Sequence, residues 1–235
     1  MHVDEIMEQL VALGSPSIKK VLINHGAKEP FYGVKVQDLK KIQAKVKKDY
    51  ELSKSLYNTG ISDAMYLAGL IADEKKMTEA DLRDWAAKAP WQMIIEYTVP
   101  WITAETPHGP KLATEWINTG DEHFASIGWA TWSNIVAITK DEQLDIPFLQ
   151  QLIERVVKTI HAAPNRVRYT MNSFVIAAGS YVPALTTQAM AAGKSIGEVE
   201  VNLGNTACKV PGIIEYIDKV KAKNYIGKKK KMARC

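Results

Sequence analysis

The sequence has little cysteine and lacks the residue patterns of metal and phosphate sites. Its two cysteines, Cys208 and Cys235, provide no disulfide framework, so we expect a protein of the reducing cytoplasm. The five histidines are dispersed, without the spacing of metal ligands, and no glycine-rich phosphate loop is present. We therefore expect neither a metal nor another cofactor.

Long hydrophobic runs, a signal peptide and flexible linkers are also absent. No run approaches the ~18–20 apolar residues of a membrane-spanning helix, and residues 1–5 lack the cationic and apolar sections of a signal peptide. No membrane partner is therefore expected. Because no stretch is rich in Pro, Gly or Ser, we predict a single repeat domain over residues 1–226. Residues 227–235 form a basic tail at a chain terminus, where disorder is common.

Apolar residues recur at helical spacing along nearly the whole chain, which predicts an all-α protein. Sets at i, i+3, i+4 and i+7 each mark the buried face of an amphipathic helix. Examples are Val3, Ile6, Met7 and Leu10, then Ala64, Leu67, Ala68 and Ile71, then Leu149, Leu152, Ile153 and Val156. The start signals agree, because residues 78–81 (TEAD) resemble a capping box and Ser62 is a suitable N-cap.

One segment of the chain is echoed sixty residues later. Residues 52–60 read LSKSLYNTG and residues 112–120 read LATEWINTG. Both end in Asn-Thr-Gly and lead into another apolar helix, as a helical hairpin with a tight glycine turn would. Hairpins stacked in series are typical of a superhelical α-solenoid, whose concave face suits a long ligand.

The end of the chain departs from the helical pattern. Residues 196–203 (IGEVEVNL) alternate apolar and polar side chains, which predicts a strand. Gly204 and Asn205 signal a turn, and residues 207–210 are a candidate antiparallel partner. We therefore predict a small β element near the C-terminus, followed by a last helix.

The tryptophans are concentrated in one part of the chain. All six lie between residues 85 and 132, and no arginine occurs between Arg83 and Arg155. Aromatic residues at this density either fill a core or line the wall of a groove, and the sequence leaves both interpretations open. Trp129 and Trp132 are i, i+3 neighbours on one helix face, so on a concave surface they could contact sugars or a base.

The charge is mildly basic and unevenly distributed. The net charge is +4, and the chain from Lys219 to its end carries eight basic and no acidic residues. Such a bias is compatible with phosphate binding and equally with a solvated surface. The candidate DNA-binding residues are Lys35, Lys40, Lys41, Arg166, Arg168, Lys228, Lys229, Lys230 and Lys231.

Several short motifs together resemble one protein family. They are FYGVKVQDLKKI at residues 31–42, LYNTG at 56–60, APW at 89–91, RVRYTMNSF at 166–174 and TACKVP at 206–211. The chain from about residue 30 to 218 resembles the HEAT-like-repeat DNA alkylation repair proteins, whose active members are DNA glycosylases. The resemblance implies a HEAT-like α-solenoid that binds damaged or distorted duplex DNA in a basic concave groove.

The resemblance also implies positions for a lesion site. The family surrounds the alkylated base with a tryptophan, an aspartate four residues later, an arginine on the next repeat and a second tryptophan. Here Trp91 matches the first tryptophan, Ile95 stands four residues on, and Glu96 is one residue further and is the candidate catalytic carboxylate. Ile127 falls where the arginine is expected, and Phe174 corresponds to the second tryptophan. Trp91, Ile95, Ile127, Trp129, Trp132 and Phe174 are thus the candidate groove residues.

Two classes of function follow. The first is a DNA-binding member of the alkylation repair family, with N-glycosylase activity on cationic N3- or N7-alkylated purines left open. The second is a non-enzymatic helical-repeat scaffold that binds a protein or another polyanion. The missing arginine and the displaced carboxylate favour binding without robust catalysis.

Overall fold

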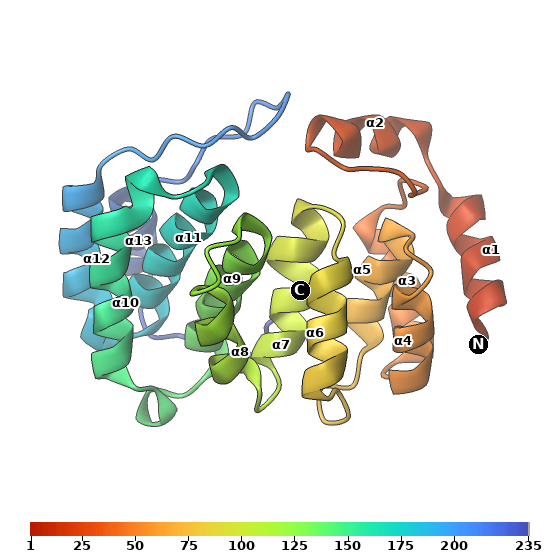
Figure 1. The fold of residues 1–235 in the computed structure, drawn as a ribbon, viewed down its shortest axis with the longest axis horizontal. Coiled ribbons are helices and arrows are strands. Elements are labelled where there is room, and N and C mark those ends of the chain that lie inside the picture. The colour runs from red at the N-terminus through yellow and green to blue at the C-terminus, as the bar shows by residue number, and fades with distance from the viewer. Residues whose placement is uncertain (235) are drawn as a thin grey trace. The chain divides into compact units, whose positions relative to one another are not determined.

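The computed structural model describes residues 1–234, and every regular element in that range is helical (Figure 1). The all-α prediction is confirmed. The elements are α1 Val3–Leu13, α2 Pro16–Asn24, α3 Val36–Val46, α4 Tyr50–Tyr57, α5 Ser62–Ile71, α6 Glu79–Lys88, the π-helix η1 Ile94–Thr98, α7 Val99–Ala104, α8 Gly109–Trp116, α9 Glu122–Ile138, the 3₁₀ turn η2 Asp141–Gln143, α10 Ile146–Thr159, the 3₁₀ turn η3 Ile160–Ala162, α11 Asn165–Tyr181, α12 Pro183–Ile196 and α13 Ile213–Ala222. None of these described helices is both long and apolar enough to cross a membrane.

The described residues divide into two compact units. Unit 1 comprises residues 1–108, 203–207 and 234, and unit 2 comprises residues 109–202 and 208–233. The single domain over residues 1–226 therefore stays a prediction, and so does disorder of the tail. Cys235, the last residue of that tail, lies outside the described residues.

Several local signals in the sequence have their expected structure. The Thr78 side chain accepts the Asp81 backbone N–H at 3.1 Å, and the Thr78 N–H donates to the Asp81 carboxylate at 3.0 Å, so the capping box is confirmed. The echoed glycines, Gly60 and Gly120, both adopt positive φ, 70° and 73°, in the turns after α4 and α8. Ser62 does not cap α5, because it is the first residue of that helix.

Unit 1 is built around α5, in which all ten residues are buried. Helices α3, α4 and α7 and the π-helix η1 pack around it. Alongside, Tyr57 of α4 stacks on Trp85 of α6 with ring centroids 4.0 Å apart, and its hydroxyl donates to the Trp85 carbonyl at 2.6 Å. This burial raises the pKa of the Tyr57 hydroxyl well above its usual value.

A buried carboxylate fixes the segment that leads from α2 to α3. Asp63 of α5 is 5% exposed. Its two oxygens accept the backbone N–H groups of Tyr32, Gly33 and Val34 at 2.5, 3.4 and 2.8 Å. Because these donors would otherwise be buried without partners, the single aspartate determines the path of this connection.

Unit 2 is centred on α9 and α11, with α8, α10, α12 and α13 around them. Close helix approach depends on glycine at two points. A Cβ on Gly128 of α9 would lie 2.8 Å from the Ala113 carbonyl oxygen of α8, and one on Gly179 of α11 would lie 2.7 Å from the Ala189 Cβ of α12. Side chains at these positions would push the helices apart.

The predicted β element is wrong for the described residues. Residues 197–212 form no strand, and their backbone groups find other partners. Asn202 donates its N–H to the Asn165 side chain at 2.7 Å and accepts the Asn165 amide at 2.9 Å, while Asn205 donates its N–H to the Asn24 carbonyl of α2 at 3.1 Å. Alternation of apolar and polar residues predicts a strand only where an antiparallel partner is available.

The last described residue is a buried arginine. The Arg234 side chain is 3% exposed, and its guanidinium lies 2.7 Å from the Glu74 carboxylate and 2.5 Å from the Glu105 carboxylate. It also donates to the carbonyls of Gly69, Leu70 and Ala72 at 3.4, 3.3 and 2.7 Å, at the C-terminal end of α5. The arginine therefore satisfies carbonyls that have no partner within the helix and places a cation at the negative end of the helix dipole.

The lysine run in the tail meets the end of α9 within unit 2. The Lys229 ammonium donates to the Val136 carbonyl at 2.8 Å and lies 2.8 Å from the Asp141 carboxylate. The backbone N–H of Lys230 donates to the Ala137 carbonyl at 2.8 Å. This part of the basic tail thus caps a helix.

Replacing Arg234 by Ala should reduce the free energy of unfolding by about 3–5 kcal/mol, because two partly buried carboxylates and three carbonyls at the C-terminal end of α5 lose their partner. Urea denaturation of the full chain measures this. Lys231→Ala, at an exposed position of the same tail, is the matched control and should change the free energy by less than about 0.5 kcal/mol. Equal stability of the two variants would contradict the role of Arg234.

Asp81 is expected to make stability pH-dependent. Burial alone would raise the pKa of its carboxyl, but hydrogen bonds from Thr78, Lys54 and Tyr50 outweigh burial and lower the pKa to about 2. Because the folded pKa lies below the unfolded value, the contribution of about 2 kcal/mol is present above pH ~4 and is lost as the pH falls through about 2.

The Asp81→Asn variant should therefore be less stable than the wild type at pH 7 and about as stable as the wild type near pH 2. Asp84→Asn, whose side chain is 46% exposed, is the control with little effect at either pH. A stability difference between wild type and Asp81→Asn that is constant from pH 7 to pH 2 would rule out this linkage.

Candidate nucleic-acid interface

The residues that follow Trp91 form a wide helical turn. One α-type bond joins the Ile95 N–H to the Trp91 carbonyl at 3.0 Å. The π-helix Ile94–Thr98 follows, in which the Val99 N–H bonds to the carbonyl of Ile94, five residues earlier. A π turn holds one residue more than an α turn, and such turns are frequent at functional sites.

This wide turn bears on the choice between Ile95 and Glu96. In a regular α-helix the residue four after Trp91 would lie about 40° from it around the axis, at 100° a residue. In a π turn each residue advances by less, but here the bond from Trp91 ends at Ile95 and the π bond joins Ile94 to Val99, so the widening begins after Trp91. Glu96 is buried at 6% exposure and Ile95 is half-buried. Glu96 is therefore buried close to Trp91, and both its register with Trp91 and its catalytic role stay predictions.

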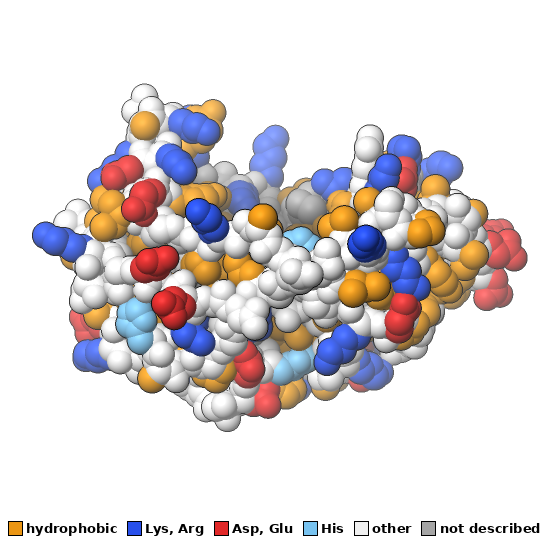
Figure 2. All heavy atoms as spheres, turned by 90° about the horizontal axis from the view of Figure 1, so that it is seen from above, with side chains coloured by type: hydrophobic (Ala, Val, Ile, Leu, Met, Phe, Trp, Pro, Cys, Tyr) orange, Lys and Arg blue, Asp and Glu red, His pale blue; other side chains and the backbone are white. Residues whose placement is uncertain are grey.

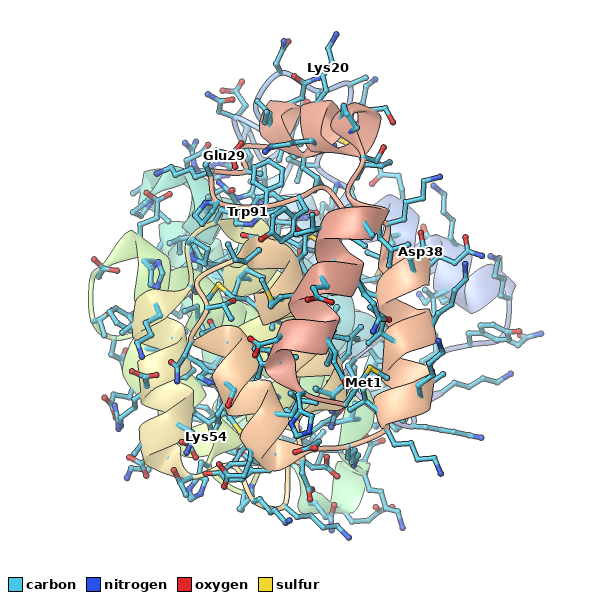
Figure 3. The ribbon with its side chains drawn as sticks, turned by 90° about the vertical axis from the view of Figure 1, so that its right-hand side faces the viewer. Met1, Lys20, Glu29, Asp38, Lys54 and Trp91 are labelled. Carbon is cyan, nitrogen blue, oxygen red and sulfur yellow. The ribbon has the colours of Figure 1, made fainter. Side chains whose placement is uncertain are left out.

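Trp91 lies inside unit 1 and has a local partner (Figure 3). Its ring is 5% exposed, and its indole N–H donates to the Ser62 hydroxyl of α5 at 2.9 Å. Ser62, expected as a helix cap, instead positions this tryptophan. Packing and this hydrogen bond, both within unit 1, therefore fix the orientation of the ring.

All six tryptophans are buried. Their exposed fractions are at most 6% for Trp85, Trp91, Trp101, Trp116, Trp129 and Trp132. In this structure they fill the cores of the two units, which is the first of the two interpretations of the cluster. Trp91, Trp129 and Trp132 therefore have little exposed surface for the predicted groove role, which stays a prediction.

The other groove candidates lie in the core of unit 2. Ile127, Trp129 and Phe174 are all 0% exposed, and the Trp129 and Phe174 ring centroids are 5.2 Å apart. Above Trp129 lies a cation that the sequence did not reveal: the Arg155 guanidinium of α10, 5.6 Å from the ring centroid. Arg155 also donates to the Asn118 side chain and to the Ile117 carbonyl, each at 2.6 Å.

Arg155 could not be identified from the sequence because its contacts, to Ile117, Asn118 and Trp129, are with residues far from it along the chain. The resemblance places an arginine at position 127, where this chain has isoleucine. Arg155 is the first arginine after the long arginine-free stretch, and that is the one signal that singles it out. Its hydrogen bonds to the end of α8 indicate a structural role.

The basic candidates belong to both units. In unit 1, Lys35, Lys40 and Lys41 are exposed on α3 or at its N-cap, and Lys41 pairs with Asp38 at 2.7 Å. They are therefore accessible to a phosphate backbone.

In unit 2 the basic candidates are partly engaged. The Arg166 guanidinium lies 4.6 Å from the Tyr169 ring centroid, and the Lys228 ammonium lies 4.0 Å from that of Tyr225. Arg168 is half-buried, and Lys228, Lys230 and Lys231 are exposed. Lys229 is the one whose ammonium caps α9 and pairs with Asp141.

Comparisons with known proteins agree with this architecture. The family model described as DNA alkylation repair enzyme matches residues 6–207. An uncharacterised protein of Listeria monocytogenes is 34% identical over 224 residues, covering 93% of this chain and 96% of that protein, and one of Listeria innocua is 33% identical over the same length. These relatives match along nearly their whole length.

A solved structure is also similar over its full length. It is described as a new family of proteins related to the HEAT-like repeat DNA glycosylases with affinity for branched DNA structures. It matches with a TM-score of 0.92 and 34% identity, covering 100% of both chains. The HEAT-like repeat fold predicted from the sequence is confirmed.

The contact between Trp91 and Ser62 can be tested by a double-mutant cycle. Trp91→Phe and Ser62→Ala each remove one side of the hydrogen bond, so the two changes should couple by about 1 kcal/mol in the free energy of unfolding. The control cycle combines Trp91→Phe with Ser133→Ala, a half-buried serine on α9 in unit 2. The effects of these two changes on the free energy of unfolding should be additive. Strict additivity of Trp91→Phe and Ser62→Ala would show that the hydrogen bond contributes nothing.

Proposed function

The chain belongs to the DNA alkylation repair family, and on that premise we propose that it binds DNA at branched or otherwise distorted sites without excising a base. The observation that carries the proposal is the full-length similarity, with a TM-score of 0.92 and 34% identity, to a protein of a family with affinity for branched DNA. Identity at this level over the whole chain supports a shared mode of binding as well as a shared fold.

The surface chemistry supports a polyanionic partner. The net charge is +4, and Lys35, Lys40 and Lys41 are exposed together on α3 and its N-cap. Contacts from lysine to phosphate provide affinity that is independent of sequence and falls as salt rises. Such contacts suit a protein that recognises the shape of DNA instead of its bases.

Burial of the candidate lesion site argues against excision. A glycosylase takes the target base out of the stack into a pocket whose walls it contacts. Here Ile127 and Phe174 have no exposed surface, and Glu96 is 6% exposed. N-glycosylase activity on cationic alkylpurines is the second candidate, and the observation that favours it is a buried carboxylate, Glu96, five residues after Trp91.

We expect tighter binding to a four-way junction than to a linear duplex of the same sequence by about tenfold or more, which is about 1.4 kcal/mol. Binding to both should weaken with salt, because lysine contacts release counterions. Fluorescence anisotropy at ~50 and ~200 mM salt measures both effects. Absence of binding to either DNA at the lower salt would overturn the proposal.

A matched pair of variants tests the lysines. Lys35→Ala with Lys40→Ala should weaken junction and duplex binding alike and make the salt dependence shallower by about two phosphate contacts. Lys75→Ala with Lys76→Ala removes the same charge at exposed positions outside the candidate set. If the control pair weakens binding equally, the effect is one of net charge alone. If heparin displaces the labelled junction as well as unlabelled junction does, a scaffold that binds another polyanion is the better interpretation of this protein.

Release of free base from DNA carrying N7-methylguanine tests the second candidate. We expect none from the wild-type protein. Release that is abolished in Glu96→Gln would instead establish Glu96 as the working carboxylate, because glutamine keeps its size but cannot stabilise cationic charge on the sugar. Release that persists in Glu96→Gln would assign the activity elsewhere.

A further inference from the structure

Helix α2 is exposed in an unusual way for a helix of this fold. None of its nine residues, all of them described, is buried. Val21 and Ile23 are 50% and 52% exposed, large fractions for aliphatic side chains. Figure 1 shows α2 lying above α3 and α5, and in Figure 3 Lys20 points away from the rest of unit 1.

This exposure does not come from loose attachment. The Ser15 N–H donates to the Tyr32 carbonyl at 3.2 Å, and the Lys19 ammonium lies 5.1 Å from the centroid of the Phe31 ring. Asp63 in turn fixes the Tyr32 backbone. At the other end, Asn205 donates to the last carbonyl of the helix, that of Asn24, at 3.1 Å. The helix is therefore tied to unit 1 at both ends while its outer side chains face solvent.

The charge around α2 indicates the chemistry of its partner. The helix carries Lys19 and Lys20 and no acidic residue, and Lys28 follows it. The acid in the following turn, Glu29, already pairs with Lys19 at 2.7 Å. In the part of Figure 2 where α2 lies, basic and hydrophobic side chains are interspersed. Val21 and Ile23 are two residues apart, so they lie on opposite flanks of the helix with Lys20 between them. Aliphatic flanks beside lysines suit a ligand that presents flat apolar faces next to phosphates, which is a nucleic acid with unstacked base pairs.

We propose that α2 is the element that recognises the branch point of DNA, with Val21 and Ile23 packed against exposed base-pair faces and Lys20 and Lys28 on the flanking phosphates. The inference rests on the proposed function and deepens it. It assigns selectivity for branched DNA to two aliphatic side chains, and general affinity to the lysines.

The physical reason is the cost of unstacking. A side chain that enters a linear duplex between two base pairs must first separate them, whereas at a branch point the stack is already interrupted. The same aliphatic contact is therefore favourable at a junction and offset by unstacking in a continuous helix. Contacts to phosphate, by comparison, are similar in both.

The experiment compares Val21→Ser with Ile23→Ser in one variant against the wild type, on a four-way junction and a linear duplex. Junction affinity should fall about tenfold, to near that of the duplex, while duplex affinity and the salt dependence stay unchanged. Val11→Ser with Leu13→Ser is the matched control, because those aliphatic side chains are 58% and 38% exposed on α1. The control should keep the junction preference. Thermal unfolding of each variant should match the wild type.

The outcomes separate this inference from the proposed function. A double variant at Val21 and Ile23 that keeps the junction preference overturns the role of α2 and leaves the proposed function standing. Wild-type protein that prefers neither DNA overturns the proposed function and this inference together. A 2-aminopurine base at the branch point gives a second readout, since its fluorescence should change on binding of the wild type and of the α1 control but not of the α2 variant.

Discussion

In a stack of short helices, each helix ends in carbonyl groups that have no hydrogen-bond partner inside the helix. In this protein, cations and backbone groups from distant parts of the sequence provide those partners. Arg234 serves the end of α5, and Lys229 with the Lys230 backbone serves the end of α9. Before the start of α3, backbone N–H groups need acceptors, and the buried Asp63 carboxylate accepts them. Correct pairing of these groups determines how the connections run.

This constraint explains why the basic character of the chain is a poor guide to its surface. Lys229 and Arg234 add to the positive charge of the tail, yet both are engaged in capping, and Arg234 is 5% exposed. The lysines of α3, by contrast, are exposed and accessible to a phosphate backbone. Counting cations therefore overestimates the area available for phosphate, and the three-dimensional assignment of each cation decides which ones a polyanion can reach.

The sequence predicted those features that depend on neighbours along the chain. Helical periodicity, the Thr78 capping box and the glycine turns at Gly60 and Gly120 all involve contacts within a few residues, and each is found. Features that depend on residues far away along the chain could not be predicted from the sequence. The strand expected at residues 196–203 had no partner, and the cation at Trp129 came from α10. The site was predictable only through family resemblance, and burial then showed that most of its aromatic members are core residues.

The π turn between Ile94 and Val99 holds one residue more than an α turn would. Helix α5 packs against both this wide turn and α7, so the core of unit 1 accommodates the widened segment. In a regular α-helix, one residue more would turn every side chain beyond it by about 100°, and a wide turn is the local means of taking that residue up.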